Sequence, residues 1–214
     1  VIVFTLLMQF FYRGNQMNIK LITDRLKKAG SILAMQNAQE KNAALLQVAE
    51  ALNQQKDSIL KANLQDVNKK KKKGISESLI DRLTLTEQRI DSIVESLKNV
   101  ISQTDPIGEE IAGWRTPNGL NIRQIRVPLG VVAIIYESRP NVTVDAFSLA
   151  YKSGNAILLR GSSSAYNSNK EIVRIIKEAL SKTKDGVPNA IELVEVKEHD
   201  HSDVDQILTA TGMI

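Results

Sequence analysis

The sequence predicts an α/β protein in which an N-terminal helical arm and a β-hairpin lead into an incomplete doubly wound parallel sheet. Three features predict this fold class. Apolar residues recur at helical spacing up to about residue 104, an Asn-Gly pair lies between strand-like segments in residues 105–129, and short apolar runs alternate with helical segments after Gly130. Of the 214 residues, 43% are hydrophobic and 24% are charged, which is typical of a globular protein and excludes a fibrous or wholly disordered chain.

The composition also limits the chemistry. The chain contains no cysteine, which excludes a disulfide scaffold, a cysteine-ligated zinc site and a thiol nucleophile carried by these residues. The 28 basic and 24 acidic residues give a net charge of +4, which favours anionic partners in general. The excess is local, because without five consecutive lysines, Lys69 to Lys73, the chain would be close to neutral. These five residues are called the lysine run below.

Residues 1–16 are expected to be an extension outside the native fold, with Met17 as the natural start. The apolar segment at residues 1–12 is shorter than the roughly 20 residues that cross a bilayer. A secretory signal carries positive charge before its apolar segment, whereas the first cation here, Arg13, follows it. We therefore expect a cytoplasmic protein with no membrane partner.

Residues 17–104 are predicted to form the helical arm. Apolar side chains recur at helical spacing as far as Leu64, over two or three helices, and the lysine run ends the last of them. A further helix is predicted from Thr84, because Thr84 and Glu87 have the spacing of a capping box.

Residues 105–129 are predicted to form a β-hairpin or flap. The segment Thr116-Pro-Asn-Gly119 is a turn sequence, and Asn-Gly between strand-like residues is a strong hairpin signal. Trp114, the only tryptophan, lies in this flap and is expected to be a packing or subunit-contact residue. A new domain is expected to begin at Gly130.

Residues 130–214 are predicted to form the first, truncated part of a nucleotide-binding domain. Three apolar runs have the length of buried parallel strands and alternate with two helical segments: strands at 131–136, 156–159 and 191–196, helices at 143–152 and 167–182. Right-handed crossovers then give a doubly wound sheet. The chain ends after one more helix-like segment, so one edge of the sheet is expected to be open.

Polar segments follow the first two predicted strands. Ligands of open α/β sheets bind at the carboxyl ends of strands, where Tyr136-Glu-Ser-Arg-Pro-Asn141 and Arg160-Gly-Ser-Ser-Ser164 lie. Neither segment is a G-x-G-x-x-G fingerprint, and the sequence contains no Walker A motif. The glycine and three serines offer hydroxyl groups and free helix-start amides, which suit a phosphate. The alternative is that Ser163 or Ser164 only caps the next helix.

The guanidinium of Arg160 adds to this phosphate signal. A planar guanidinium binds phosphate in bidentate fashion, and a cation at the end of a buried strand needs an anion or solvent. We expect the side chains of Arg139 and Arg160 to share one cleft.

Residues 127–146, with the core Tyr-Glu-Ser-Arg-Pro-Asn-Val-Thr, and residues 152–161 closely resemble the gamma-glutamyl phosphate reductases, a family of the aldehyde dehydrogenase superfamily. The resemblance extends from about residue 17 to about residue 205 and covers roughly the first half of a family member. It implies an aldehyde dehydrogenase-type sheet and a reductase that converts L-glutamyl 5-phosphate to L-glutamate 5-semialdehyde with NADPH in proline biosynthesis. It also implies a cysteine thiolate that forms a thioester, so this fragment alone is expected to be inactive.

The resemblance assigns roles to both polar segments. It implies that Arg160 contacts the 2′-phosphate of NADP. The expected cofactor-binding residues are Tyr136, Glu137, Arg160, Gly161, Ser162 and Ser163. The candidate oxyanion or substrate contacts are Ser138, Arg139 and Asn141, among which the sequence does not choose. The alternative for Asn141 is a plain helix N-cap. The resemblance further implies a homo-oligomer at full length.

Two other clusters carry weaker signals. The segment His199-Asp-His201 with Asp203 looks like a metal cluster, but such a turn is typical of a capping loop, and no metal site is predicted. The lysine run lacks interleaved aromatic residues and is expected to be a solvated loop, so nucleic acid is not the expected partner. The alternative hypothesis is a non-catalytic, basic α/β module that binds nucleic acid through the lysine run.

Overall fold

The computed structural model describes residues 19–196 and 202–210, and its first part is the predicted helical arm. The helices are α2 (Ile19–Leu33), α3 (Ala38–Gln54), α4 (Lys56–Lys71), α5 (Glu77–Leu83) and α6 (Glu87–Ser102). α3 begins at a full capping box, in which Asn37 Oδ1 accepts the N–H of Glu40 at 3.0 Å and a Glu40 carboxylate oxygen accepts the N–H of Asn37 at 2.8 Å.

The N-cap predicted for α6, Thr84, lies two residues before the observed N-cap. Thr86 is the N-cap, because its hydroxyl accepts the N–H of Arg89 at 3.2 Å. The hydroxyl of Thr84 donates instead to the carbonyl of Ile80 at 2.6 Å, which ties it to the end of α5. Both threonines are possible caps by spacing, and tertiary contacts decide between them.

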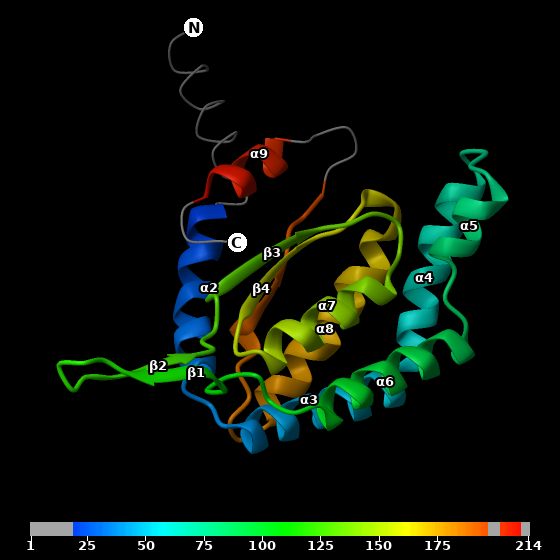
Figure 1. The fold of residues 1–214 in the computed structure, drawn as a ribbon. Coiled ribbons are helices and arrows are strands. Elements are labelled where there is room, and N and C mark those ends of the chain that lie inside the picture. Colours follow the sequence, from blue (N-terminus) through cyan, green and yellow to red (C-terminus); the bar gives the residue numbers. More distant parts are fainter. Residues whose placement is uncertain (1–18, 197–201, 211–214) are drawn as a thin grey trace, which may run out of the picture.

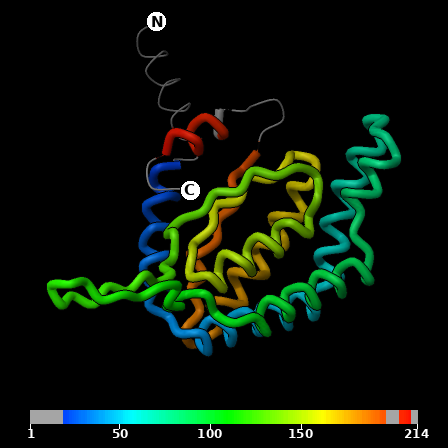
Figure 2. The backbone as a smooth tube through the Cα atoms, viewed as in Figure 1, coloured from blue at the N-terminus to red at the C-terminus, as the bar shows by residue number. Residues whose placement is uncertain are grey.

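β1 (Glu110–Arg115) and β2 (Asn121–Ile125) form the predicted hairpin, which projects from the body of the molecule (Figure 1, Figure 2). In its turn, the N–H of Gly119 donates to the carbonyl of Thr116 at 2.9 Å, and the φ of Gly119 is 90°, a left-handed value that favours glycine. Every residue of both strands is exposed, including Trp114 at 54%. The hairpin thus displays its apolar side chains.

The predicted parallel sheet is confirmed, with β3 (Val131–Ile135), β4 (Ala156–Arg160) and β5 (Ile191–Leu193) in the order β3-β4-β5. Two helices connect these strands and a third follows them; they are α7 (Asn141–Lys152), α8 (Tyr166–Lys182) and α9 (Ser202–Thr209). Short 3-10 turns, η1 (Ser163–Ala165) and η2 (Pro188–Ala190), precede α8 and β5.

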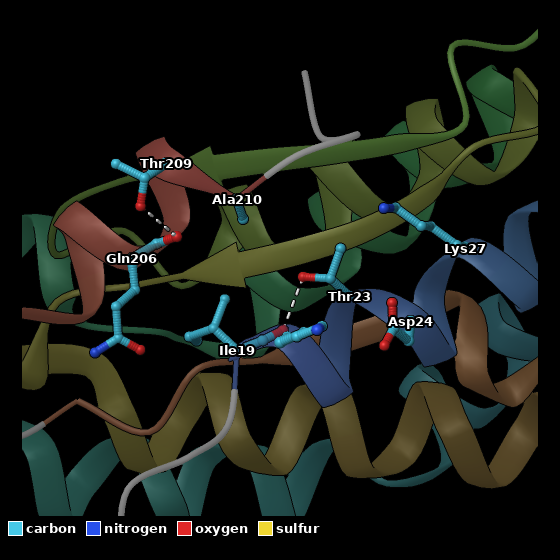
Figure 3. Close-up of a pocket in the computed structure, with 8 residues that line it drawn as sticks. Ile19, Thr23, Asp24, Lys27, Gln206, Thr209 and Ala210 are labelled. Atoms are coloured by element: carbon cyan, nitrogen blue, oxygen red, sulfur yellow. Dashed lines mark hydrogen bonds between the residues drawn. The ribbon is translucent and has the colours of Figure 1, made fainter.

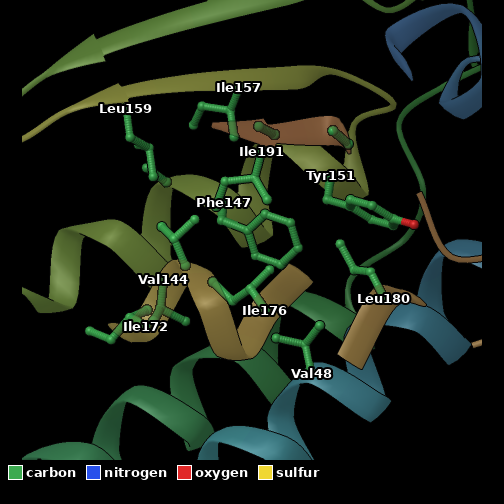
Figure 4. Packing of buried hydrophobic residues seen from close by; sticks show 14 of the residues in the cluster. Val48, Val144, Phe147, Tyr151, Ile157, Leu159, Ile172, Ile176, Leu180 and Ile191 are labelled. Carbon is green, nitrogen blue, oxygen red and sulfur yellow. The ribbon is translucent and has the colours of Figure 1, made fainter. Parts of the chain in front are cut away.

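Helices cover both faces of this sheet. Crossovers of this kind are right-handed as a rule, so three strands in consecutive order place α7 and α8 on the same face. Figure 4 shows Phe147 of α7 and Ile176 of α8 against Ile157 and Leu159 of β4. α2 contacts all three strands from the other side. Within the described residues, the helix that covers the second face of the sheet is therefore the N-terminal α2 and not a crossover helix.

One cluster of buried apolar side chains joins the helical arm to the sheet. It includes Leu26 of α2. Figure 4 shows three further members, Val48 of α3, Phe147 of α7 and Ile157 of β4. This buried cluster contains residues from both sides of the domain boundaries expected at residues 104 and 130. The division into domains remains a prediction.

Candidate functional site

The two polar segments that follow β3 and β4 begin side by side. Ile135 pairs with Arg160 in the parallel register, and the N–H of Tyr136 donates to the carbonyl of Arg160 at 3.0 Å. The carboxyl ends of both strands therefore lie at one edge of the sheet, which is where ligands of such sheets bind.

A chain of buried hydrogen bonds holds this edge together. The hydroxyl of Tyr136 lies 2.7 Å from that of Thr143, which in turn donates to Asn169 Oδ1 at 3.0 Å. Burial raises the pKa of Tyr136 to about 12, although the hydrogen bond to Thr143 opposes the shift. Tyr136 is thus a neutral phenol at physiological pH, and it links β3 to α7 and α8 rather than serving as a base.

Gly161 packs tightly against this chain. A Cβ added at Gly161 would lie 2.4 Å from Asn169 Nδ2 and 3.2 Å from the Tyr136 hydroxyl. Asn169 is fully buried, and its Nδ2 has no hydrogen-bond partner in the described part of the chain. The structure therefore gives a packing reason for glycine at position 161, in addition to the close approach of a cofactor that the sequence predicts.

The start of α8 already holds an anion. Asp66 of α4 accepts the N–H groups of Asn167 at 3.3 Å and of Ser168 at 2.8 Å. The expectation of free helix-start amides is wrong at these two positions, because a carboxylate of the same chain occupies them. Neither Ser163 nor Ser164 caps α8, because the N-cap of this helix is Ala165. Ser162 caps the preceding 3-10 turn, since its hydroxyl accepts the N–H of Ser164 at 3.1 Å.

The predicted cofactor contacts beside β4 differ in how far they are buried. Arg160 is buried, with 8% of its surface exposed, whereas Ser162 and Ser163 are half-buried. Glu137 is exposed on the neighbouring segment. These residues lie at the same edge of the sheet, as the sequence predicts, and their contacts with a cofactor remain a prediction.

Arg139 and Asn141 line a different feature, a groove of about 400 Å³ between α5, α6 and the start of α7. Arg160 is not among the residues that line this groove, so one cleft shared by Arg139 and Arg160 is not confirmed.

Asn141 is the first residue of α7 and Pro140 is the N-cap, which makes the N-cap alternative for Asn141 wrong. The Asn141 amide donates instead to Asp145 Oδ2 at 3.3 Å. Ser138 is half-buried and lies outside the groove lining.

Three residues of this region are not predicted from the sequence: Asp66, Asp145 and Asn169. Asp66 and Asn169 lie on buried helix faces where periodicity favours apolar side chains. Asp145 lies four residues after Asn141, and this i, i+4 spacing is the signal that places it beside the predicted segment.

A second groove, of about 350 Å³, lies between α2 and α9 (Figure 3). Its charged groups are on α2, where Asp24 and Lys27 face it, and the Thr209 hydroxyl donates back to the carbonyls of its own helix. No residue that the sequence predicts for the site lines this groove.

The lysine run is not the expected loop in its first half. Lys69, Lys70 and Lys71 form the last turn of α4, where basic side chains complement the helix dipole. Lys70 is buried, with 8% of its surface exposed, and the other four lysines are exposed.

His199 and His201 lie outside the described residues. Each helix within residues 19–196 and 202–210 is too short or too polar to span a bilayer.

A family model described as the aldehyde dehydrogenase family matches residues 7–211 of the chain. The chain belongs to the aldehyde dehydrogenase family. Its similarity to gamma-glutamyl phosphate reductases is also confirmed. The curated enzyme of that name from Geobacillus kaustophilus is 51% identical over 173 residues, which are 80% of this chain and 41% of that protein. The one from Dictyoglomus thermophilum is 47% identical over 197 residues, or 90% of this chain and 46% of that protein.

Solved structures agree with this aldehyde dehydrogenase fold. A gamma-glutamyl phosphate reductase from Thermotoga maritima superposes with a TM-score of 0.83 at 44% identity, over 87% of this chain and 44% of that chain. An acetylating aldehyde dehydrogenase from Geobacillus thermoglucosidasius, at 17% identity and a TM-score of 0.69, shares the fold over 91% of this chain and 40% of that chain. The chain spans less than half the length of these relatives.

Proposed function

We propose that this chain is the N-terminal part of a cytoplasmic, NADPH-dependent reductase that converts L-glutamyl 5-phosphate to L-glutamate 5-semialdehyde in proline biosynthesis. The observation that carries the proposal is 51% identity over 173 residues to a gamma-glutamyl phosphate reductase, supported by the TM-score of 0.83 to another. Because the matched region is less than half of those relatives, the activity is proposed for a longer polypeptide.

The donor set at the end of β4 fits the 2′-phosphate of NADPH. Arg160 supplies a guanidinium, and the neighbouring Ser162 and Ser163 supply hydroxyl groups. The amides of Asn167 and Ser168 contribute little to phosphate binding, because Asp66 accepts them. The cofactor, when bound, supplies the hydride.

The thiolate step needs a group from outside this sequence. The 214 residues contain no cysteine, so the nucleophile that the resemblance implies has to come from the rest of a longer polypeptide. In this proposal the described chain binds the adenosine phosphate of NADPH through Arg160 and the substrate through the groove of Arg139 and Asn141.

Isothermal titration of the full-length protein that contains this chain, with NADPH and NADH, tests the cofactor assignment. We expect Arg160→Ala to weaken NADPH binding by about tenfold or more and NADH binding by less than about threefold, because only NADPH carries the 2′-phosphate. The matched control is Arg174→Ala on the exposed face of α8, which should leave both affinities unchanged. Equal losses for the two cofactors would remove Arg160 from the 2′-phosphate.

We also propose that the hairpin joins copies of the chain in a homo-oligomer. Trp114 lies opposite Ile122 in the register of the hairpin, and both side chains are exposed, at 54% and 37%. Exposed aromatic side chains are enriched at protein interfaces. Sedimentation of the wild type and of Trp114→Ser tests this. We expect a concentration-dependent mass that falls in the variant; a wild type that stays monomeric at all concentrations contradicts it.

A further inference from the structure

The groove between α5, α6 and the start of α7 carries charges of both signs. Its volume of about 400 Å³ is of the size that small-molecule sites have, roughly 300–1,000 Å³. Arg82, Arg139 and Asp145 are among its lining residues, together with polar groups such as Ser96 and Asn141. The groove therefore has the size and the chemistry of a site for a small charged molecule.

Asp145 is the acidic group of the groove that lies on α7. It is half-buried, and from the described residues its carboxylate accepts two long hydrogen bonds, both from neutral groups, at 3.3 Å from Asn141 Nδ2 and at 3.4 Å from Ser96 Oγ. Within the described residues no lysine or arginine pairs with it. Burial raises its pKa, against the effect of the two hydrogen bonds. A cationic ligand would stabilise a carboxylate in this position.

The arginines of the groove differ in how they are held. Arg89 is fixed, because its guanidinium donates to the carbonyls of Asp81 and Thr84 at 2.5 and 2.7 Å and pairs with the Asp81 carboxylate at 2.8 Å. The side chain of Arg139 is exposed and has no ion-pair partner among the described residues, Asp145 included. The groove thus presents an anion and a cation that do not neutralise each other.

We propose that this groove binds the α-amino-acid end of the substrate, with the α-ammonium group on Asp145 and the α-carboxylate on Arg139. A zwitterion satisfies both groups at once, since its ammonium and carboxylate groups are bonded to the same carbon atom, and a guanidinium binds a carboxylate in bidentate fashion. The inference rests on the proposed function, because it takes the amino-acid nature of the substrate from there. It assigns Arg139 to the carboxylate rather than to the reacting carbonyl.

Titration of the full-length protein that contains this chain with three ligands tests this assignment. L-Glutamate carries both α-groups, glutarate lacks the ammonium group, and 4-aminobutyrate lacks the α-carboxylate. We expect L-glutamate to bind at least about tenfold more tightly than either analogue. Asp145→Asn should weaken L-glutamate by about 10- to 100-fold and leave glutarate nearly unchanged, because only L-glutamate uses that carboxylate. Arg139→Gln should do the same to L-glutamate while leaving 4-aminobutyrate unchanged.

The controls separate the outcomes. Glu95→Gln removes an exposed carboxylate of α6 outside the groove and should bind all three ligands as the wild type does. Circular dichroism melts check that each variant is folded. If Asp145→Asn keeps the preference for L-glutamate, the groove assignment is wrong and the proposed function stands. The groove assignment also fails if the wild type binds none of the ligands or does not prefer L-glutamate over glutarate. In that case the proposed substrate loses its support as well. The cofactor assignment is tested separately, by the NADPH titration.

Discussion

The carboxylate of Asp66, on α4, accepts both the backbone N–H and the hydroxyl of Ser168, at the start of α8, at 2.8 and 2.6 Å. Its other oxygen accepts the side-chain amide of Asn167 at 2.8 Å. A side chain of the helical arm thus caps a helix that covers the sheet, a hundred residues along the chain. The carboxylate of Asp66 therefore occupies two of the helix-start amides at which an external anion could otherwise bind.

We expect Asp66→Ala to lower the free energy of unfolding by about 3 kcal/mol, because it removes a charged cap and leaves buried donors unpaired. The matched control is Asp57→Ala, which removes an exposed carboxylate from the first turn of the same helix and should cost less than about 1 kcal/mol. Urea denaturation followed by circular dichroism measures both. A loss for Asp66→Ala no larger than that of the control would show that the cap contributes little.

We expect Gly161→Ala to destabilise the protein by about 1–3 kcal/mol and to weaken NADPH binding, because the new methyl group would overlap the buried Asn169 and Tyr136 side chains. Gly113→Ala is the control. Its Cβ would lie 2.5 Å from Glu110 Oε1, but this is the end of an exposed side chain that can move, so we expect a change within about 0.5 kcal/mol. Thermal melts compare the two, and equal effects would contradict the packing argument.

The sheet and the hairpin follow from local sequence signals. Apolar runs of strand length, separated by helical segments, predict β3, β4 and β5, and the Asn-Gly turn predicts the hairpin. The boundaries are less well predicted. β5 ends at Leu193 although the apolar pattern continues to Val196, because the last backbone hydrogen bond to β4 is the one from the Val194 N–H to the Leu159 carbonyl, at 2.8 Å. Local pattern cannot show how far two neighbouring strands pair.

The polar network behind the site could not be predicted in the same way. On α4, Asn63 and Asp66 are each 2% exposed, whereas Leu64, which the periodicity places on the buried face, is 59% exposed. Asn63 accepts the N–H of Leu85 at 2.8 Å and donates to Ser168 Oγ at 3.0 Å. Burial of these polar groups is favourable only because of partners far along the chain, and a single helix sequence carries no trace of such partners.

Stability should fall at alkaline pH because of Tyr136 and Tyr151. Burial raises the pKa of each to about 12, above the value of about 10 in the unfolded chain. Their contribution is therefore fully present below pH 10 and is lost as the pH rises through 12, with a slope of up to about 1.4 kcal/mol per pH unit for each tyrosine. Urea unfolding at pH 9, 10 and 11 measures it. Tyr151→Phe should reduce the slope, and an unchanged slope would contradict the assignment.

Lys41 and Asp105 form an ion pair of 2.5 Å just before the hairpin, and the Lys41 side chain is only 1% exposed. We expect Asp105→Asn to cost about 3–5 kcal/mol, because it leaves a buried ammonium group without a counter-charge. The double variant Lys41→Met with Asp105→Asn should regain most of this loss, since no isolated charge remains. Glu109→Gln, which breaks an exposed pair with Arg126, is the control and should cost less than about 1 kcal/mol. Urea denaturation of the four proteins decides: a double variant no more stable than Asp105→Asn would show that the loss has another cause than the buried charge.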